Sequence, residues 1–149
     1  MTQPHPALLM AIAARDVEAR VLAGVHAAGY DDLTPAQARI AARIDEGGSR
    51  LGVLAEAARV TKQSAAVAVD ALEASGYVER RPDPADGRAK VIVLAPRGRK
   101  ARAAAREVEH QIAAAWQDAL GPARYAAMMD ALIALRPHVD PWFAAPDGN

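Results

Sequence analysis

Apolar residues recur three and four positions apart over most of the chain and alternate only in one short central stretch. Residues 6–28 show the first pattern and predict an amphipathic helix. Thr34, Pro35 and Gln37 then have the types and spacing of an N-cap, a first helical residue and the partner in a capping box. We therefore expect a second helix from this point to about Glu46.

Two further helices, joined by a tight link, are predicted next. The spacing indicates a third helix at about 53–59 and a fourth at 62–75, with Thr61 as the N-cap of the fourth. Two helices joined by three or four residues form a helix-turn-helix unit. The apolar face of the fourth helix follows the i, i+3, i+4, i+7 spacing and is expected to enter the core: Ala65, Ala68, Val69 and Leu72.

After this unit the spacing of apolar residues changes from that of a helix to that of strands. Residues 77–81 and 88–94 have the pattern of two strands, and the segment 82–87 between them is dense in proline, aspartate and glycine. Together they predict a β-hairpin with a long polar tip. A hairpin in this position beside a helix-turn-helix unit is a wing.

A long helix over about 97–119 and a last helix over about 122–135 complete the predicted elements. At ~1.5 Å per residue the long helix spans about 35 Å, too much for so small a domain to cover. The tail from Pro137 is expected to be loosely held. The last helix is expected to bury its large apolar side chains: Tyr125, Met128, Met129, Leu132, Ile133 and Leu135.

These elements predict a mainly α fold with a small β-hairpin wing, which is a winged helix-turn-helix plus a helical dimerisation region. Three apolar stripes lie outside the winged core and need a partner, which a second copy of the chain would supply. The expected divisions are an N-terminal dimerisation helix (1–32), a winged helix-turn-helix domain (33–95) and C-terminal dimerisation helices with the tail (96–149).

The net charge is zero at neutral pH, but the charges are unevenly distributed. Residues 59–106 hold eleven Lys and Arg against five Asp and Glu, whereas the segments on either side are net acidic. A local basic surface can bind phosphate on a neutral protein, although a solvated face with no partner would give the same pattern.

Composition excludes several other functions. There is no cysteine, which removes disulfides and thiol-based sensing. There is no nucleophile–base pair, phosphate loop or metal motif, so we expect neither an enzyme nor a cofactor. The sequence has no run long enough to span a membrane and no signal-peptide pattern at its start, so we expect a cytoplasmic protein with no membrane partner.

The order of helices, hairpin and long helix resembles the MarR family of transcriptional regulators. The resemblance covers about 8–136 and implies a homodimeric DNA-binding regulator, usually a repressor. It rests on segments that follow the family's order: Leu-Thr-Pro-Ala-Gln at 33–37, Leu-Ala at 54–55, Thr-Lys-Gln-Ser at 61–64, Leu-Glu-Ala-Ser-Gly-Tyr-Val-Glu-Arg at 72–80 and Asp-Pro-Ala-Asp-Gly-Arg-Ala at 83–89.

The resemblance makes the fourth helix the recognition helix. Helix N-terminal amides favour phosphate, and Gln63 can pair with adenine. Ala66 and Val67 stand where the family often has a hydroxyl and a basic residue. They can only pack on thymine methyls, so we expect few direct base bonds and more reliance on DNA shape, or else weak binding. The candidate contacts are Thr61, Lys62, Gln63, Ser64, Ala66 and Val67.

The wing supplies the remaining candidate DNA contacts. Arg88 is expected to enter a narrow minor groove. Asp86 would hold its guanidinium by a charge-assisted hydrogen bond, and the alternative is a surface ion pair of little energetic value. Arg80, Arg81 and Lys90 are candidate phosphate contacts.

The resemblance also implies a dimer of the terminal helices and a regulatory ligand. A two-fold dimer would place two recognition helices about 34 Å apart on a pseudo-palindromic operator in double-stranded DNA. MarR-like proteins typically release DNA when a small, often aromatic or phenolic, effector enters the crevice between the dimer helices and the winged domain. The candidate dimer residues are Leu8, Ile12, Val108, Ile112, Trp116, Met129 and Leu132.

Two alternatives remain open. One is a winged-helix protein-interaction module that has lost operator recognition, which the apolar Ala66 and Val67 and the neutral net charge favour slightly. The other is a non-specific DNA binder. Steep salt-dependent binding to duplex DNA excludes the first, and preference for an operator over random duplex excludes the second.

Overall fold

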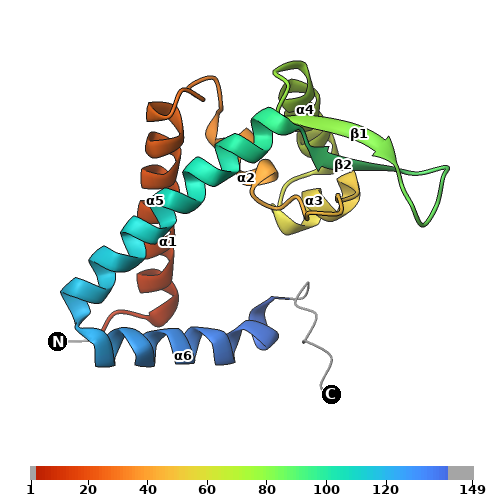
Figure 1. The fold of residues 1–149 in the computed structure, drawn as a ribbon. Helices are drawn as coiled ribbons and strands as arrows, with labels where there is room; N and C mark the ends of the chain where they lie inside the picture. The colour runs from red at the N-terminus through yellow and green to blue at the C-terminus, as the bar shows by residue number, and fades with distance from the viewer. Residues whose placement is uncertain (1–2, 141–149) are drawn as a thin grey trace. The chain divides into compact units, whose positions relative to one another are not determined.

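The structure is a computed structural model that describes residues 3–140, and these residues form helices and one antiparallel hairpin (Figure 1). The predicted mainly helical class with a single hairpin is confirmed. None of the described helices is long and apolar enough to cross a membrane. The elements in chain order are α1 (Pro6–Ala27), α2 (Pro35–Ala41), α3 (Leu51–Ala57), α4 (Lys62–Ala74), β1 (Val78–Pro82), β2 (Lys90–Leu94), α5 (Pro96–Leu120) and α6 (Pro122–Val139).

The chain divides into two compact units, one ending at Glu109 and the other beginning at His110, so α5 contributes to both. The first unit contains the buried core. Its helices α2 and α3 both pack on α4, and β1 follows α4 closely. The α4 face predicted from the sequence is buried there together with residues from α1 to α5, and the least exposed large side chains are Tyr77, Leu54, Leu72, Val69 and Val78.

Helix α4 begins and ends as the sequence predicts. The Thr61 hydroxyl accepts a hydrogen bond from the Ser64 amide at 3.0 Å. At the other end Gly76 has φ +77°, a left-handed conformation that a glycine adopts without strain. The amide of Tyr77 then donates to the carbonyl of Leu72, which closes the last turn. The capping box of α2 is also present, with Thr34 and Gln37 bonded to each other's backbone amides.

Two helices differ from the expected bounds. Helix α2 ends at Ala41 and not near Glu46, because the amides of Arg43 and Ile44 bond three residues back and tighten the chain into a turn. Helix α3 begins at Leu51, two residues early, and ends at Ala57. The residue that reverses the chain after α3 is Arg59, at φ 54°, in the left-handed region that arginine rarely adopts.

The hairpin pairs Val78 with Leu94 at its base and Pro82 with Lys90 at its far end. Figure 1 shows the connecting loop projecting beyond α3 and α4. Ser49, in the segment before α3, forms an isolated antiparallel bridge to the hairpin. Its backbone exchanges hydrogen bonds with that of Ile92 at 3.0 and 2.8 Å. This bridge joins the hairpin to the start of α3 and was not visible in the sequence pattern.

The second unit contains α6, which is longer and less covered than predicted. The helix continues past Pro137 to Val139, so the loose tail does not begin at that proline. None of its residues is buried, so the expectation that it buries its apolar side chains is wrong for a single chain. Met129, Leu132 and Ile133 are exposed at 37%, 41% and 62%. The rest of the tail, including Trp142 and Phe143, lies outside the described residues.

Candidate functional site

The first two turns of α4 present a polar surface away from the core. Lys62, Gln63 and Ser64 are all exposed at the amino end of the helix. Thr61 donates its hydroxyl hydrogen to the Ser64 oxygen at 2.9 Å, so both hydroxyls are engaged in the cap. Val67 is 65% exposed, which is unusual for a β-branched apolar residue in a helix with a buried opposite face.

The wing loop, residues 83–89, is held by its own backbone. Its first amide, Asp83, donates to the carbonyl of Ala89 at 2.9 Å. The Asp86 carboxylate accepts from the backbone amide of Arg88 at 3.1 Å, which differs from the expected bond to the guanidinium. An aspartate two residues before an amide readily forms this local turn, and it leaves the Arg88 side chain exposed.

The base of the wing is anchored to the residue just before α3. The Asp83 side chain is only 9% exposed, and one of its oxygens accepts from Arg50 Nε at 2.6 Å and Nη2 at 2.5 Å. The other oxygen accepts from the Ala85 amide at 2.9 Å. The Ala85 amide and then the Arg50 guanidinium hold the pKa of Asp83 below its ordinary value. These bonds fix where the wing loop starts.

Arg80 connects β1 to α4. Its guanidinium donates to Asp70 at 2.6 Å and also to Glu73, both on α4. The Asp70 hydrogen bond is the main cause that raises the pKa of Arg80. Two carboxylates therefore surround a group that the sequence suggested as a phosphate contact, and Arg81 is similarly paired with Glu79 at 2.8 Å.

Three of the basic candidates from the sequence have no carboxylate partner. Of the ion pairs within residues 3–140, none involves Lys62, Arg88 or Lys90, and all three side chains are exposed. The structure thus separates the five basic candidates into two paired arginines and three cations available to an outside anion.

Tyr77 forms a junction that the sequence analysis missed. It is 2% exposed, and its hydroxyl donates to Asp32 in the loop before α2. Arg97 of α5 donates to the same carboxylate at 3.1 Å and to the Ser75 carbonyl at 2.5 Å, with its guanidinium carbon 4.3 Å from the Tyr77 ring centroid. Burial and then the Asp32 bond raise the pKa of Tyr77 to about 12. The junction ties the end of α4 to α5 and to the loop before α2.

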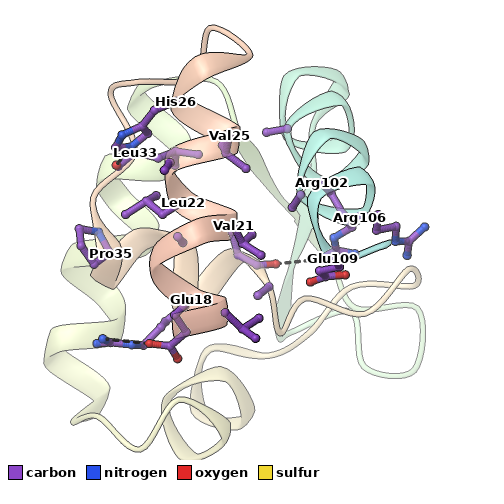
Figure 2. A pocket seen from close by; sticks show the side chains of 18 of the residues that line it. Glu18, Val21, Leu22, Val25, His26, Leu33, Pro35, Arg102, Arg106 and Glu109 are labelled. Atoms are coloured by element: carbon purple, nitrogen blue, oxygen red, sulfur yellow. Dashed lines mark hydrogen bonds and ion pairs between the residues drawn. The ribbon is translucent and has the colours of Figure 1, made fainter. Parts of the chain in front are cut away.

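A pocket of about 740 Å³ lies within the first unit, lined by α1, α2, the start of α5 and single residues between them. Figure 2 shows Val21, Leu22 and Val25 of α1 on one side and Arg102, Arg106 and Glu109 of α5 on the other. The volume is in the range of sites that hold drug-sized molecules. The charged lining side chains are Arg15, Glu18, Arg39, Arg43, Arg102, Arg106 and Glu109.

The candidate dimer residues are distributed unevenly in the single chain. Leu8 and Ile12 of α1 are 54% and 48% exposed. In α5, Ile112 is buried, Trp116 is half-buried, and Val108 packs against α1 so closely that a Cβ on Gly24 would lie 2.3 Å from its Cγ2 atom. Met129 and Leu132 of α6 are exposed.

Comparison with known proteins agrees with this geometry. Residues 31–89 match the model of the MarR family. The chain is 27% identical to the transcriptional regulator Tm0710 from Thermotoga maritima, with 94% of this chain and 97% of that chain covered and a TM-score of 0.63. Among curated protein sequences, none matches.

Two other solved structures have the same fold. A MarR transcriptional regulator from Methanosarcina mazei Go1 is 16% identical, with 89% of this chain and 94% of that chain covered and a TM-score of 0.71. CouR from Rhodococcus jostii RHA1, solved bound to p-coumaroyl-CoA, is 20% identical, with 93% and 94% covered and a TM-score of 0.68.

The fold and the exposed helix beside a hairpin define a winged helix-turn-helix protein. The resemblance to the MarR family identified from the sequence is confirmed over the segment that the family model matches. The matched segment contains the helix-turn-helix and most of the wing.

Proposed function

We propose that this protein is a sequence-specific DNA-binding transcriptional regulator. It would act as a homodimer, and a small-molecule effector would control its binding to DNA. The observation that carries the proposal is the arrangement of Lys62, Arg88 and Lys90. These exposed cations have no carboxylate partner among the described ion pairs, and they flank the amino end of α4 and the wing. Such a surface fits a nucleic-acid backbone.

The recognition helix would supply the sequence preference. Gln63 can bond to adenine, and the exposed Val67 can pack on a thymine methyl in the major groove. Asp70 and Glu73 lie on the same helix and would repel phosphate, but Arg80 binds both and offsets part of their negative charge. Arg80 would therefore act on DNA binding indirectly, and Arg88 is the wing residue that we propose enters the minor groove.

The dimer rests on the apolar surface of the terminal helices. Leu8 and Ile12 of α1 expose large apolar side chains, and so do Met129 and Leu132 of α6; exposed apolar surface of this kind is typical of an interface. A second copy would cover them and would repeat the recognition helix for a pseudo-palindromic site. The pocket beside α1 is the proposed effector site. Repression relieved by the effector is the regulation that we propose.

The test is a fluorescence-anisotropy titration of the full chain against the duplex upstream of its own gene and a scrambled duplex, at two salt concentrations. We expect preference for the upstream duplex and a steep loss of affinity with salt. Arg88→Ala should weaken binding to the upstream duplex, whereas Arg81→Ala, which removes an already paired arginine, should do less. Weak, equal binding to both duplexes that ignores Arg88 would favour a protein-interaction module.

A further inference from the structure

Three helices of the first unit end with the same backbone motif. After α1, α3 and α4 the chain passes through one residue in the left-handed region, and two backbone hydrogen bonds close the last turn. In α1 and α4 the left-handed residue is a glycine, Gly29 at φ 99° and Gly76 at φ 77°. In α3 it is Arg59 at φ 54°, and within residues 3–140 no other residue with a positive φ carries a side chain.

The backbone at this position favours glycine over arginine. A Cβ atom makes the left-handed region unfavourable, and only short polar side chains tolerate it well. The turn itself holds the conformation, because the amides of Arg59 and Val60 donate to the carbonyls of Glu56 and Ala55, both at 3.0 Å. The chain therefore retains an unfavourable residue at a position where glycine would fit, and strain of this kind is concentrated at functional positions.

The guanidinium of Arg59 has no carboxylate partner in the described part of the chain. The residue is exposed, and none of the ion pairs within residues 3–140 involves it or Glu56, one turn earlier on α3. A basic side chain at the end of a helix can bind the last carbonyls. In α3, however, Arg43 already donates from its Nε atom to the carbonyl of Ala57 at 2.8 Å. Arg59 is therefore a cation available to an outside anion.

Arg59 lies in the link between α3 and α4, beside the surface that we propose contacts DNA. Two residues separate it from the exposed Lys62, so the two Cα atoms are at most about 11 Å apart. A DNA duplex carries one negative charge for about every 1.7 Å of its axis. A duplex that meets the amino end of α4 therefore brings phosphate groups within reach of a side chain as long as that of arginine.

We propose that Arg59 binds a phosphate of the DNA duplex, and that this contact maintains an arginine where the backbone favours glycine. The inference rests on the proposed function and adds a residue that the sequence pattern did not identify. A guanidinium donates two parallel, charge-assisted hydrogen bonds to phosphate oxygens. Phosphate contacts position a duplex without reading its sequence, so Arg59 contributes to affinity and not to operator preference.

Replacing Arg59 with glycine should change stability and DNA binding in opposite directions. Arg59→Gly removes the strain and should raise Tm by about 2–4 °C in thermal unfolding. In a fluorescence-anisotropy titration of the full chain, it should weaken binding to the upstream and the scrambled duplex by the same factor, about fivefold or more at 0.1 M salt. The slope of log K against log salt should fall by about 0.9 for each chain of the dimer.

Three further variants separate the charge from the backbone. Arg59→Gln keeps a side chain in the left-handed region and loses the charge, so it should weaken both duplexes as glycine does without the rise in Tm. Arg59→Lys keeps the charge and should retain most of the salt slope. Arg20→Gln removes one positive charge from α1, where Asp16 is the partner of Arg20 at 3.5 Å, and should leave the slope unchanged.

The outcomes distinguish this inference from the proposed function. If Arg59→Gly binds both duplexes as the wild type does, or loses Tm together with affinity, the phosphate contact is overturned and the regulator stands. If the wild type binds both duplexes equally and Arg59→Gly still lowers the salt slope, the sequence-specific regulator is overturned and the phosphate contact stands. A wild type that binds neither duplex would overturn both.

Discussion

Gly98, near the start of α5, lies so close to the end of α4 that any larger residue must displace backbone. A Cβ built on Gly98 would be 2.1 Å from the carbonyl oxygen of Tyr77 and 3.1 Å from Leu94 Cδ2. That carbonyl also accepts the hydrogen bond of the Ala95 amide at 2.9 Å, which joins the end of β2 to the start of β1. The Gly98→Ala substitution therefore tests whether α5 and the winged core are locked together at Tyr77.

The expected cost combines three contributions. Forcing a methyl into a packed site costs about 1–3 kcal/mol, and weakening the Ala95 hydrogen bond costs about 1 kcal/mol. Alanine recovers about 0.5–1 kcal/mol because it is a better helix residue than glycine. The net loss of unfolding free energy is about 1–3 kcal/mol, or a fall in Tm of roughly 3–10 °C for a chain of this size.

The assay is thermal and urea unfolding followed by circular dichroism, at one fixed protein concentration because a dimer is expected. Gly52→Ala is the matched control, since Gly52 also lies in a helix but a Cβ there would meet no atom within 4 Å. The control should be unchanged or more stable by up to about 1 kcal/mol. If Gly98→Ala is as stable as Gly52→Ala, the close contact with Tyr77 does not hold α5 and the reasoning is wrong.

Three further substitutions test other parts of the structure. Tyr77→Phe should lower the unfolding free energy by about 1–2 kcal/mol. Because folding raises the pKa of Tyr77 from 10.0 to about 12, this contribution is complete below pH 10 and is lost as the pH rises towards 12. An ultraviolet titration of the wild type should show an ionisation near pH 12 that the variant lacks. Arg80→Ala should weaken duplex binding by exposing two carboxylates on α4, and adding Asp70→Asn and Glu73→Gln should restore it; failure of that rescue in an anisotropy titration would instead assign Arg80 to direct phosphate contact. Leu132→Asp should shift the chain from dimer to monomer in sedimentation velocity, while Arg88→Ala should remain a dimer. If both variants remain dimers, α6 does not form part of the interface.

The elements of the winged core were predictable because their signals are local. The Thr61 cap, the Gly76 stop and the spacing of the α4 face each lie within a few residues, and the structure has all three. The sequence predicts too long a helix α2, because Gly47 and the glycine after it indicate a helix end near Glu46. The chain turns earlier, through short-range backbone bonds at Arg43 that no side-chain pattern announces.

The partners of the charged side chains were not predictable, because they join residues far apart in sequence. Arg50 meets Asp83 across 33 positions, and Arg102 meets the carbonyl of Ala41 across 61. The sequence identified Arg80 as basic, but only the fold shows that two carboxylates of α4 already bind it. The pocket is likewise formed from segments between residues 15 and 109, and its excess of arginines has no counterpart in any one segment.

We propose that this chain recognises duplex DNA as a dimer of winged domains. The most direct measurement is selection of duplexes by the full chain from a randomised library, followed by sequencing of the bound pool. We expect enrichment of a pseudo-palindrome with half-site centres about 34 Å apart, and loss of that enrichment with Arg88→Ala. A pool that stays random, with wild type and variant retaining the same duplexes, would contradict it.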